Sequence, residues 1–253
     1  MSALLLHANN PSPWTGPTGT NTFLLRGRVP TLVDTGIGDP AHLEAIAAAL
    51  DGEALALVLV THGHPDHAGG LPAIAQRWPS ARVLRFADLS GRLDEWIPAG
   101  DTRLRPVHTP GHAPDHLCFL DEGGDLFCGD LCRKGGTIVV PASHGGNARE
   151  YVESLRRVRA LAPKRLLPGH GPIIDDPAAI LDQYLRHREE REAQVLAALQ
   201  RGLDTPESIA TSVYGELPTL FARAAADGVL AHLIKLLEEG VVRQDAGRWR
   251  TLI

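Results

Sequence analysis

The sequence predicts an α/β protein that ends in a small winged-helix module. Short runs of leucine and β-branched residues alternate with helical segments over the first two thirds of the chain, which is typical of a layered α/β domain. After residue 176 the pattern becomes helix, helix, helix and hairpin, the order of a winged helix. We therefore expect one large and one small domain, residues 1–176 and residues 177–253.

The first domain is expected to start with a hairpin of strands over residues 23–26 and 31–33, followed by a helix over 41–50. The run Leu55-Ala56-Leu57-Val58-Leu59-Val60 is typical of a buried strand, and it leads to a helix over 71–77. The remaining elements are short strands and a closing helix, expected over residues 82–86, 117–120, 126–128, 137–140 and 148–161.

The C-terminal module begins after Asp175-Asp176-Pro177 with a long helix over residues 178–201. This helix is rich in Arg, Glu, Ala and Leu, with charges at the i,i+4 spacing of a solvated face. A cap and a first-turn proline at Thr205-Pro206 predict a fresh helix start. The remaining elements are helices over 207–213 and 220–239 and a hairpin of strands over 241–243 and 249–252.

Four side chains that can bind metal leave the end of the strand over 55–60 together: His62, His64, Asp66 and His67. Burying so many polar groups in one place costs free energy unless something binds them, and a divalent cation or a pair of cations is the obvious partner. Because side chains alternate, His62 and His64 can face one metal ion, while Asp66 and His67 can face a second.

Three further candidates lie downstream at junctions between strands and loops. They are His112, Asp130 and His170, and each stands directly after a glycine that allows unusual backbone angles and close approach. Histidines and aspartates delivered from several strand ends suit a metal centre better than scattered surface positions.

This series, together with Asp34-Thr35-Gly36 after the strand over 31–33, resembles the metallo-β-lactamase superfamily of binuclear hydrolases. The resemblance covers about residues 20 to 175, with the motifs in the expected order. It implies an αββα sandwich, in which two mixed sheets carry helices on the outside and the site lies along one edge.

The resemblance also implies roles for the candidate residues. It assigns His62, His64 and His112 to a first metal ion, Asp66, His67 and His170 to a second, and Asp130 to both as a bridge. Zinc is the first choice, at two Zn²⁺ per chain, although nitrogen and oxygen ligands also suit iron or manganese. A hydroxide held between the two ions then attacks a carbonyl carbon or a phosphorus, and Asp66 orients that hydroxide or takes its proton.

At two positions this chain differs from other members of the superfamily, and both differences limit the reactions that it is expected to catalyse. Many zinc β-lactamases carry a cysteine ligand where this chain has Asp130, and the families with a bridging carboxylate hydrolyse esters, thioesters, lactones or phosphodiesters. The diiron flavoproteins carry a glutamate where His64 stands, and no flavodoxin-like domain follows here. Reduction of oxygen or nitric oxide is therefore disfavoured.

Other polar residues near the motifs have weaker signals. His116 and Asp115 either support a metal-ligating imidazole or lie in solvent. His144, in a loop expected to reach the mouth of the site, is predicted to bind an anionic group of the substrate. The others are expected to be structural, solvated or inert: His7, His42, His187, His232, Cys118, Cys128 and Cys132, the last close to Asp130 but not required as a ligand.

The sequences Pro168-Gly169-His170-Gly171-Pro172 and Tyr184-x-x-His187-Arg188-x-x-Arg191, followed by a winged helix, resemble the lactamase-like protein 2 branch of the superfamily. That branch includes an endoribonuclease acting on single-stranded RNA, and related sequences act on thioesters, including polyketide intermediates on carrier proteins. The resemblance thus leaves two substrate classes open.

Charge favours the acyl substrates. From Leu203 onward the chain has five Lys or Arg residues against seven Asp or Glu residues, so the winged helix is not basic enough to grip phosphates unaided. It is expected instead to pack on the catalytic domain as one wall of the cleft, with a homodimer contact left open. Only 5% of the residues are aromatic, so RNA bases have few stacking platforms.

Bulk properties place the expected enzyme in the cytoplasm. The net charge of −5 and the pI near 6.2 give no sign of a general nucleic-acid or membrane binder. Neither a leader segment nor a bilayer-spanning run is evident, and three cysteines, an odd number, favour a reducing compartment.

The sequence therefore predicts a binuclear zinc hydrolase acting on an ester, thioester or lactone, with a small-molecule acyl substrate or single-stranded RNA as its partner and no membrane. The alternatives are a metal-dependent endoribonuclease, an iron-dependent oxygenase like the persulfide dioxygenases, and a nucleic-acid-binding regulator with a vestigial site.

Overall fold

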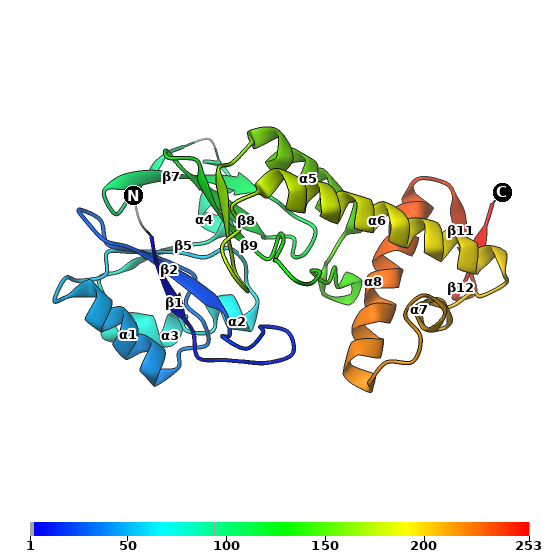
Figure 1. Cartoon of the computed structure of the whole chain (residues 1–253), viewed down its shortest axis with the longest axis horizontal. Helices are drawn as coiled ribbons and strands as arrows, with labels where there is room; N and C mark the ends of the chain where they lie inside the picture. The colour runs from blue at the N-terminus through cyan, green and yellow to red at the C-terminus, as the bar shows by residue number, and fades with distance from the viewer. Residues whose placement is uncertain (1–2, 94, 253) are drawn as a thin grey trace. The chain divides into compact units, whose positions relative to one another are not determined.

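Two five-stranded mixed sheets form the layered part of the chain (Figure 1). The computed structural model describes residues 3–93 and 95–252. The first sheet has the order β1-β2-β3-β4-β5, antiparallel from β1 to β3 and parallel from β3 to β5. Its strands are β1 (Leu4–His7), β2 (Asn21–Leu25), β3 (Thr31–Val33), β4 (Leu57–Leu59) and β5 (Arg82–Leu84).

The second sheet has the order β10-β9-β8-β7-β6 and is antiparallel except between β9 and β10. Its strands are β6 (Ile97–Ala99), β7 (Thr102–His108), β8 (Leu117–Asp121), β9 (Asp125–Gly129) and β10 (Arg165–Pro168). Because β9 and β10 run parallel, their carboxyl ends, which precede Asp130 and His170, meet at the same edge of the sheet.

The core lies between the two sheets and on the outer face of the first. Along β2, Phe23 and Leu25 join a cluster that contains Phe119 and Phe127 of the second sheet, and the Phe23 and Phe127 rings meet edge to face at 5.3 Å. The alternate residue Leu24 points to the opposite face, as strand geometry requires. There it meets residues of two helices. The four helices of this region are α1 (Pro40–Leu50), α2 (Pro65–Ala68), α3 (Leu71–Arg77) and α4 (Phe86–Leu89).

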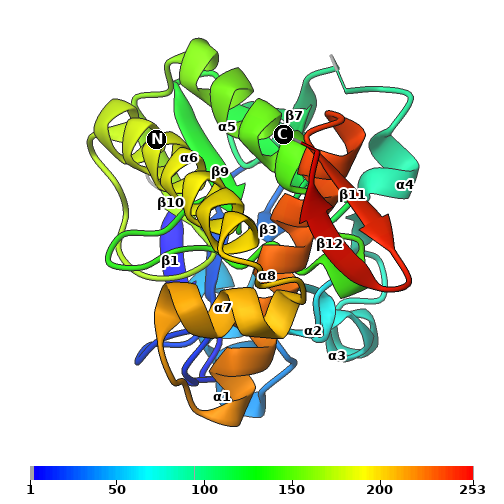
Figure 2. The same ribbon diagram turned by 90° about the vertical axis from the view of Figure 1, so that its right-hand side faces the viewer.

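A second set of helices and a hairpin follows along the chain (Figure 2). These elements are α5 (Ala148–Leu161), α6 (Pro177–Gln200), α7 (Pro206–Tyr214), α8 (Thr219–Glu238), β11 (Val242–Asp245) and β12 (Arg248–Thr251). The end of α6, α7, α8 and the hairpin share one apolar cluster that includes Val195, Ile209, Leu233 and Trp249. The hairpin turns at Ala246 and Gly247, both with positive φ, which matches the right-handed twist of its strands.

Contacts along the chain define two compact units. Residues up to 109, 115–137 and 161–180 form the first, which contains both five-stranded sheets. Residues 110–114, 138–160 and 181 onward form the second, which contains most of α5 and α6 and all of the winged helix. The domain boundary expected at residue 176 stays a prediction. Among the described residues, no helix combines the length and the apolar composition needed to cross a bilayer.

Most of the expected elements are present. The helices over 71–77 and 148–161 have the expected bounds, and the two predicted hairpins pair as antiparallel strands. The structure also contains elements that apolar runs alone did not reveal, namely β1, β6, α2 and α4.

Two expected strands need correction. Residues 137–140 form no strand, because the carbonyl groups of Ile138 and Val139 accept hydrogen bonds from the side chains of Arg188 and His112 instead of a neighbouring strand. The strand expected over 82–86 stops at Leu84. Directly after it, the Asp88 carboxylate accepts a hydrogen bond from the Arg85 amide, and this bond caps the start of α4.

Candidate metal centre

The clustered motif is held by the end of β4 and the one-turn helix α2. His64 precedes this helix, Pro65 supplies its first position, and the His67 amide donates to the His64 carbonyl at 3.0 Å. This turn directs His67 inward, where its side chain is fully buried, while His62 is 1% exposed. His64 and Asp66 remain partly exposed. The motif therefore presents two buried and two accessible groups at one edge of the first sheet.

Carboxylates and imidazoles from three segments of the first unit converge there. His170 Nε2 lies 3.2 Å from both Asp66 Oδ2 and Asp130 Oδ1, and His67 Nε2 lies 3.4 Å from the same two atoms. Two groups of possible ligands result, each with its donor atoms within 4.8 Å of one another. They are His62, His67 and Asp130, and Asp66, His67 and His170.

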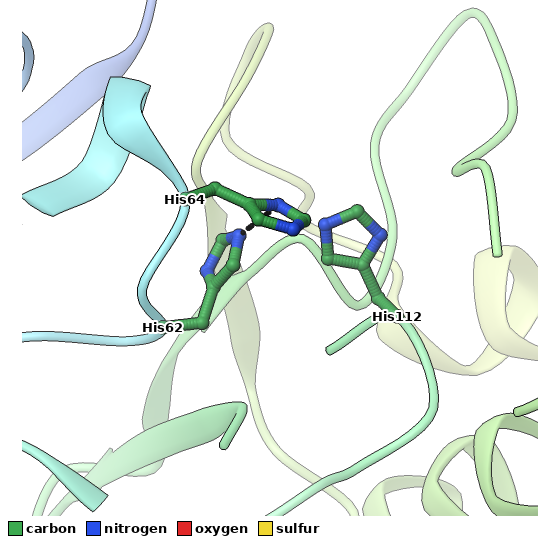
Figure 3. A group of neighbouring side chains, drawn as sticks. All are labelled: His62, His64 and His112. Carbon is green, nitrogen blue, oxygen red and sulfur yellow. Dashed lines mark hydrogen bonds between the residues drawn. The ribbon is translucent and has the colours of Figure 1, made fainter. Parts of the chain in front are cut away.

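A third group consists of His62, His64 and His112 (Figure 3), again with donor atoms within 4.8 Å. His62 Nε2 lies 3.0 Å from His64 Nδ1. His112 belongs to the short segment 110–114, which continues at both ends into residues of the first unit. Its Nδ1 lies 2.7 Å from the Val139 carbonyl oxygen, so Nδ1 carries the proton and Nε2 is left as a metal-ligating nitrogen.

Asp34 has a role that the sequence did not reveal. This residue follows β3 with φ of 61°, and its Oδ2 accepts a hydrogen bond from His67 Nδ1 at 2.7 Å. The same carboxylate accepts the amide and hydroxyl hydrogens of Thr61, each at 2.8 Å. Asp34 therefore fixes the His67 tautomer and turns Nε2 toward the carboxylates. The sequence signal for this role was the position of Asp34 itself, in the Asp34-Thr35-Gly36 turn at the end of a strand.

His116 supports Asp130 and does not lie in solvent. It is fully buried, its Nε2 accepts the Asp130 amide hydrogen at 3.0 Å, and its Nδ1 lies 2.8 Å from Thr109 Oγ1. Asp115 is partly buried and lines a neighbouring pocket. A further contact that the sequence did not indicate joins Thr20 to the cluster, because its hydroxyl donates to Asp66 Oδ2 at 3.3 Å.

Glycine is required where the second sheet approaches the cluster. A Cβ at Gly169 would lie 2.5 Å from His67 Cε1 and 3.0 Å from Asp130 Oδ1, closer than such atoms pack. The missing side chain thus leaves the space in which the imidazole and the carboxylate lie side by side.

The electrostatics of the cluster fit divalent cations. Burial acts to raise the pKa of Asp130, but the His170 and His67 imidazoles outweigh it and hold that pKa well below its usual range. Burial also opposes protonation of the two imidazoles. Nevertheless Asp130 and Asp34 raise the pKa of His67 well above its usual value, and Asp130 and Asp66 raise the pKa of His170 to about 9. These protons offset buried negative charge, and a bound cation replaces them.

The donor atoms support the same conclusion. His67 Nε2 is buried and has no hydrogen-bond partner among the described residues, which is costly for a polar atom unless it binds something. Imidazole nitrogens and carboxylate oxygens are ligands that suit zinc and also iron or manganese.

The remaining candidates lie outside the three groups. His144 is exposed, with Nδ1 2.9 Å from Ser143 Oγ, and its contact with substrate stays a prediction. His42 is 1% exposed and bonds to Thr22, in keeping with a structural role. The three cysteines are buried and not in disulfides, and burial raises the pKa of Cys118 and Cys128 well above the ordinary thiol value, so both are inert.

A pocket of about 680 Å³ shares His62 with the cluster. Most of its walls are apolar and come from residues such as Val60, Leu71, Val83 and Phe86. Among the described residues that line it, Arg85 is the only Lys or Arg residue. The pocket lies within the first unit and offers space for an apolar group next to the candidate metal ligands.

Sequence comparison identifies two families along the chain. The Metallo-beta-lactamase superfamily matches residues 15–85 and 92–170, and the Beta-lactamase associated winged helix domain matches residues 205–249. Together these matches confirm the expected α/β class with a C-terminal winged helix.

Individual relatives match over most of the chain. The Beta-lactamase-like protein 2 homolog of Drosophila melanogaster is 34% identical, over 92% of this chain and 87% of its own. The Lactamase-like protein aptB of Emericella nidulans is 35% identical, over 90% and 79%. A crystal structure of a beta-lactamase domain protein from Burkholderia ambifaria matches with a TM-score of 0.82 and 25% identity, over 98% of this chain and 90% of that one.

Proposed function

This chain belongs to the metallo-β-lactamase superfamily, an enzyme family that is generally hydrolytic, and from that premise we propose a hydrolase that binds two divalent cations and cleaves an ester, thioester or lactone. The observation that carries the proposal is the convergence of Asp66, Asp130, His67 and His170, with nitrogen-to-oxygen distances of 3.2–3.4 Å at one sheet edge. A divalent cation bound there would replace the imidazole protons that offset the buried carboxylates.

The proposed ligand assignment follows the three groups of donor atoms. One cation would be held by His62, His64 and His112 and the other by Asp66, His67 and His170, and Asp130 would be shared between them. Asp130 is suited to that shared role, because it groups with His62 and also lies 3.2 Å from His170. When bound, the pair of cations supplies an activated water nucleophile and an electrophile for the carbonyl oxygen. Zinc is the preferred cation, since its catalytic sites keep an open position for water.

Asp66 is proposed as the residue that orients the attacking water and takes its proton. It is partly exposed, whereas Asp130 and the nearby imidazoles are buried. Thr20 donates to Asp66 Oδ2 and fixes the carboxylate's orientation. A carboxylate that is both oriented and open to solvent can release the proton after each turnover.

The pocket beside His62 supports an acyl substrate. Its apolar walls would remove an acyl chain or ring from water, which stabilises binding by about 0.8 kcal/mol per buried CH₂ group. Polynucleotides need several cations along a groove, and Arg85 alone does not supply them. The chain is accordingly proposed to act on a small acyl compound, with single-stranded RNA as the alternative.

The test is a substrate screen on protein of known metal content. The metal would be measured by plasma mass spectrometry, and thioester, lactone, phosphodiester and single-stranded RNA substrates compared before and after chelation. The expected result is two ions per chain and acyl hydrolysis that chelation abolishes and zinc restores. Cleavage of RNA alone, or a single iron with oxygen consumption, would contradict the proposal.

A further inference from the structure

Arg188 is a buried cation of the second unit that the proposed reaction does not use directly. It lies on α6 with 7% of its surface exposed, and burial of a guanidinium is costly unless other groups pair or hydrogen-bond with it. Its Nη2 donates a hydrogen bond of 2.7 Å to the Ile138 carbonyl. Its guanidinium carbon lies 5.0 Å from the centre of the Tyr151 ring, and Tyr151 is fully buried.

The hydrogen bond to Ile138 and the contact with Tyr151 each link Arg188 to the surroundings of His112. Ile138 precedes Val139, whose carbonyl oxygen lies 2.7 Å from His112 Nδ1. The Ile138 and Val139 carbonyl groups belong to consecutive planar peptide units that are joined at the Cα atom of Val139. Fixing the Ile138 carbonyl therefore restricts the direction of the Val139 carbonyl. This segment forms no strand and therefore depends on such side-chain contacts for its conformation.

The second route runs through Tyr151 to the residue before His112. Gly111 has φ of 129°, and a Cβ there would lie 2.3 Å from the backbone N and Cα of Tyr151. The Gly111 carbonyl accepts the Asn147 amide hydrogen at 2.8 Å, and the Pro110 carbonyl accepts the Ser154 hydroxyl at 2.7 Å. The backbone of segment 110–114 is thus packed directly against α5. Gly111 contacts Tyr151 there, and the guanidinium of Arg188 lies over the Tyr151 ring.

From these contacts we infer that Arg188 is a positioning residue, which holds the His112 imidazole in the orientation that ligates the first cation. The inference rests on the proposed function, because it takes His112 to be a ligand. Arginine suits the role, since its planar group can donate to a carbonyl and lie against an aromatic ring at the same time, whereas lysine offers only a point charge. The second unit would then contribute to metal binding through His112 and also through Arg188, which orients that ligand.

The test measures metal affinity, which a purely structural contact would leave unchanged. Arg188→Met, Arg188→Lys and the matched control Arg186→Met, an exposed arginine of the same helix, would be titrated with zinc against a chromophoric chelator. Partners that orient a ligating histidine typically change metal affinity by about 10- to 100-fold. We expect a loss of about 10-fold for one of the two ions in Arg188→Met, a smaller loss in Arg188→Lys, and wild-type affinity for both ions in the control.

A double-mutant cycle shows whether Arg188 acts through His112. His112→Ala should weaken the same ion, and adding Arg188→Met to it should cause no further loss. Wild-type affinity in whichever Arg188 variant folds, or losses that multiply in the double variant, would overturn the inference. A wild-type chain that binds no metal would instead overturn the proposed function, so the two failures are distinguishable.

Discussion

Among single residues, Asp34 orients a candidate metal ligand although it belongs to none of the three groups of candidate ligands. Its Oδ2 accepts the His67 Nδ1 hydrogen while its other contacts anchor it to Thr61. The carboxylate is an acceptor only, so the proton must stay on Nδ1 and Nε2 must face the cluster.

Replacing Asp34 by Asn tests this role. An amide nitrogen facing His67 Nδ1 places a donor against a donor, which favours the wrong tautomer or a rotated ring. We expect the affinity of one of the two ions to fall by about 10- to 100-fold. Isothermal titration of the metal-free protein measures it, with Asp51→Asn, at an exposed carboxylate outside the cluster, as the control. An unchanged affinity would mean that Asp34 only stabilises the turn.

From the burial of His42 we expect the stability of the protein to depend on pH, whether or not metal is bound. Burial lowers the pKa of this residue in the folded protein to about 4, from an ordinary value near 6.5. Between those values the unfolded chain binds more protons at this residue, so the contribution of His42 to the free energy of unfolding decreases as the pH falls from 6.5 toward 4 and is constant above that window. The full loss amounts to about 3 kcal/mol.

The measurement is urea denaturation of the wild type and His42→Gln across that pH range. The glutamine variant should show a flatter profile between pH 6.5 and 4, because it has no proton to gain. His7→Gln, at an exposed position on β1, is the control for the substitution itself. Parallel profiles for the wild type and the His42 variant would disprove the assignment.

At the scale of elements, short apolar runs predict strands poorly where side chains form hydrogen bonds with the backbone of the run. Residues 137–140 have a strand-like composition, yet two of their carbonyl groups accept hydrogen bonds from Arg188 and His112. The long helices were predicted better, because their bounds depend on local caps. In α6, for example, Asp176 accepts the Ala179 amide hydrogen at the helix start.

Helix α8 offers a prediction about stability. Gly228 lies in its interior, its backbone φ is not positive, and a Cβ there would meet no atom within 4 Å. Gly228→Ala should therefore raise the free energy of unfolding by about 0.5–1 kcal/mol, as an alanine loses less backbone freedom than a glycine. Chemical denaturation measures the change. Gly202→Ala, also open but with φ of 87°, is the matched control and should destabilise.

At the scale of the whole molecule, the metal centre should contribute to stability as well as to chemistry. The carboxylates of Asp66 and Asp130 lie close together, and their burial costs solvation free energy that a bound cation offsets. Cations that bind only the folded chain stabilise it by about 2.7 kcal/mol at a free concentration 100 times the dissociation constant. Chelation should therefore lower the melting temperature by several degrees, and added zinc should restore it.

Scanning calorimetry with and without chelator tests this expectation. Asp66→Asn and His170→Gln, which remove proposed ligands, should reduce the shift that chelation causes. An identical melting temperature with and without chelator, in protein shown to contain metal, would mean that the cations bind the folded and unfolded chains equally.

The sequence by itself determined the α/β class and the winged helix, because strand runs and helix caps are local patterns. It also predicted the candidate ligands, through the motif from His62 to His67 and the resemblance to the metallo-β-lactamase superfamily. Only the tertiary structure decided that Asp34 orients His67, that His116 supports Asp130 and that Arg188 reaches Ile138. Those pairs lie 33, 14 and 50 positions apart. Hydrogen bonds between such distant residues depend on how the strands and helices pack, which no local pattern encodes.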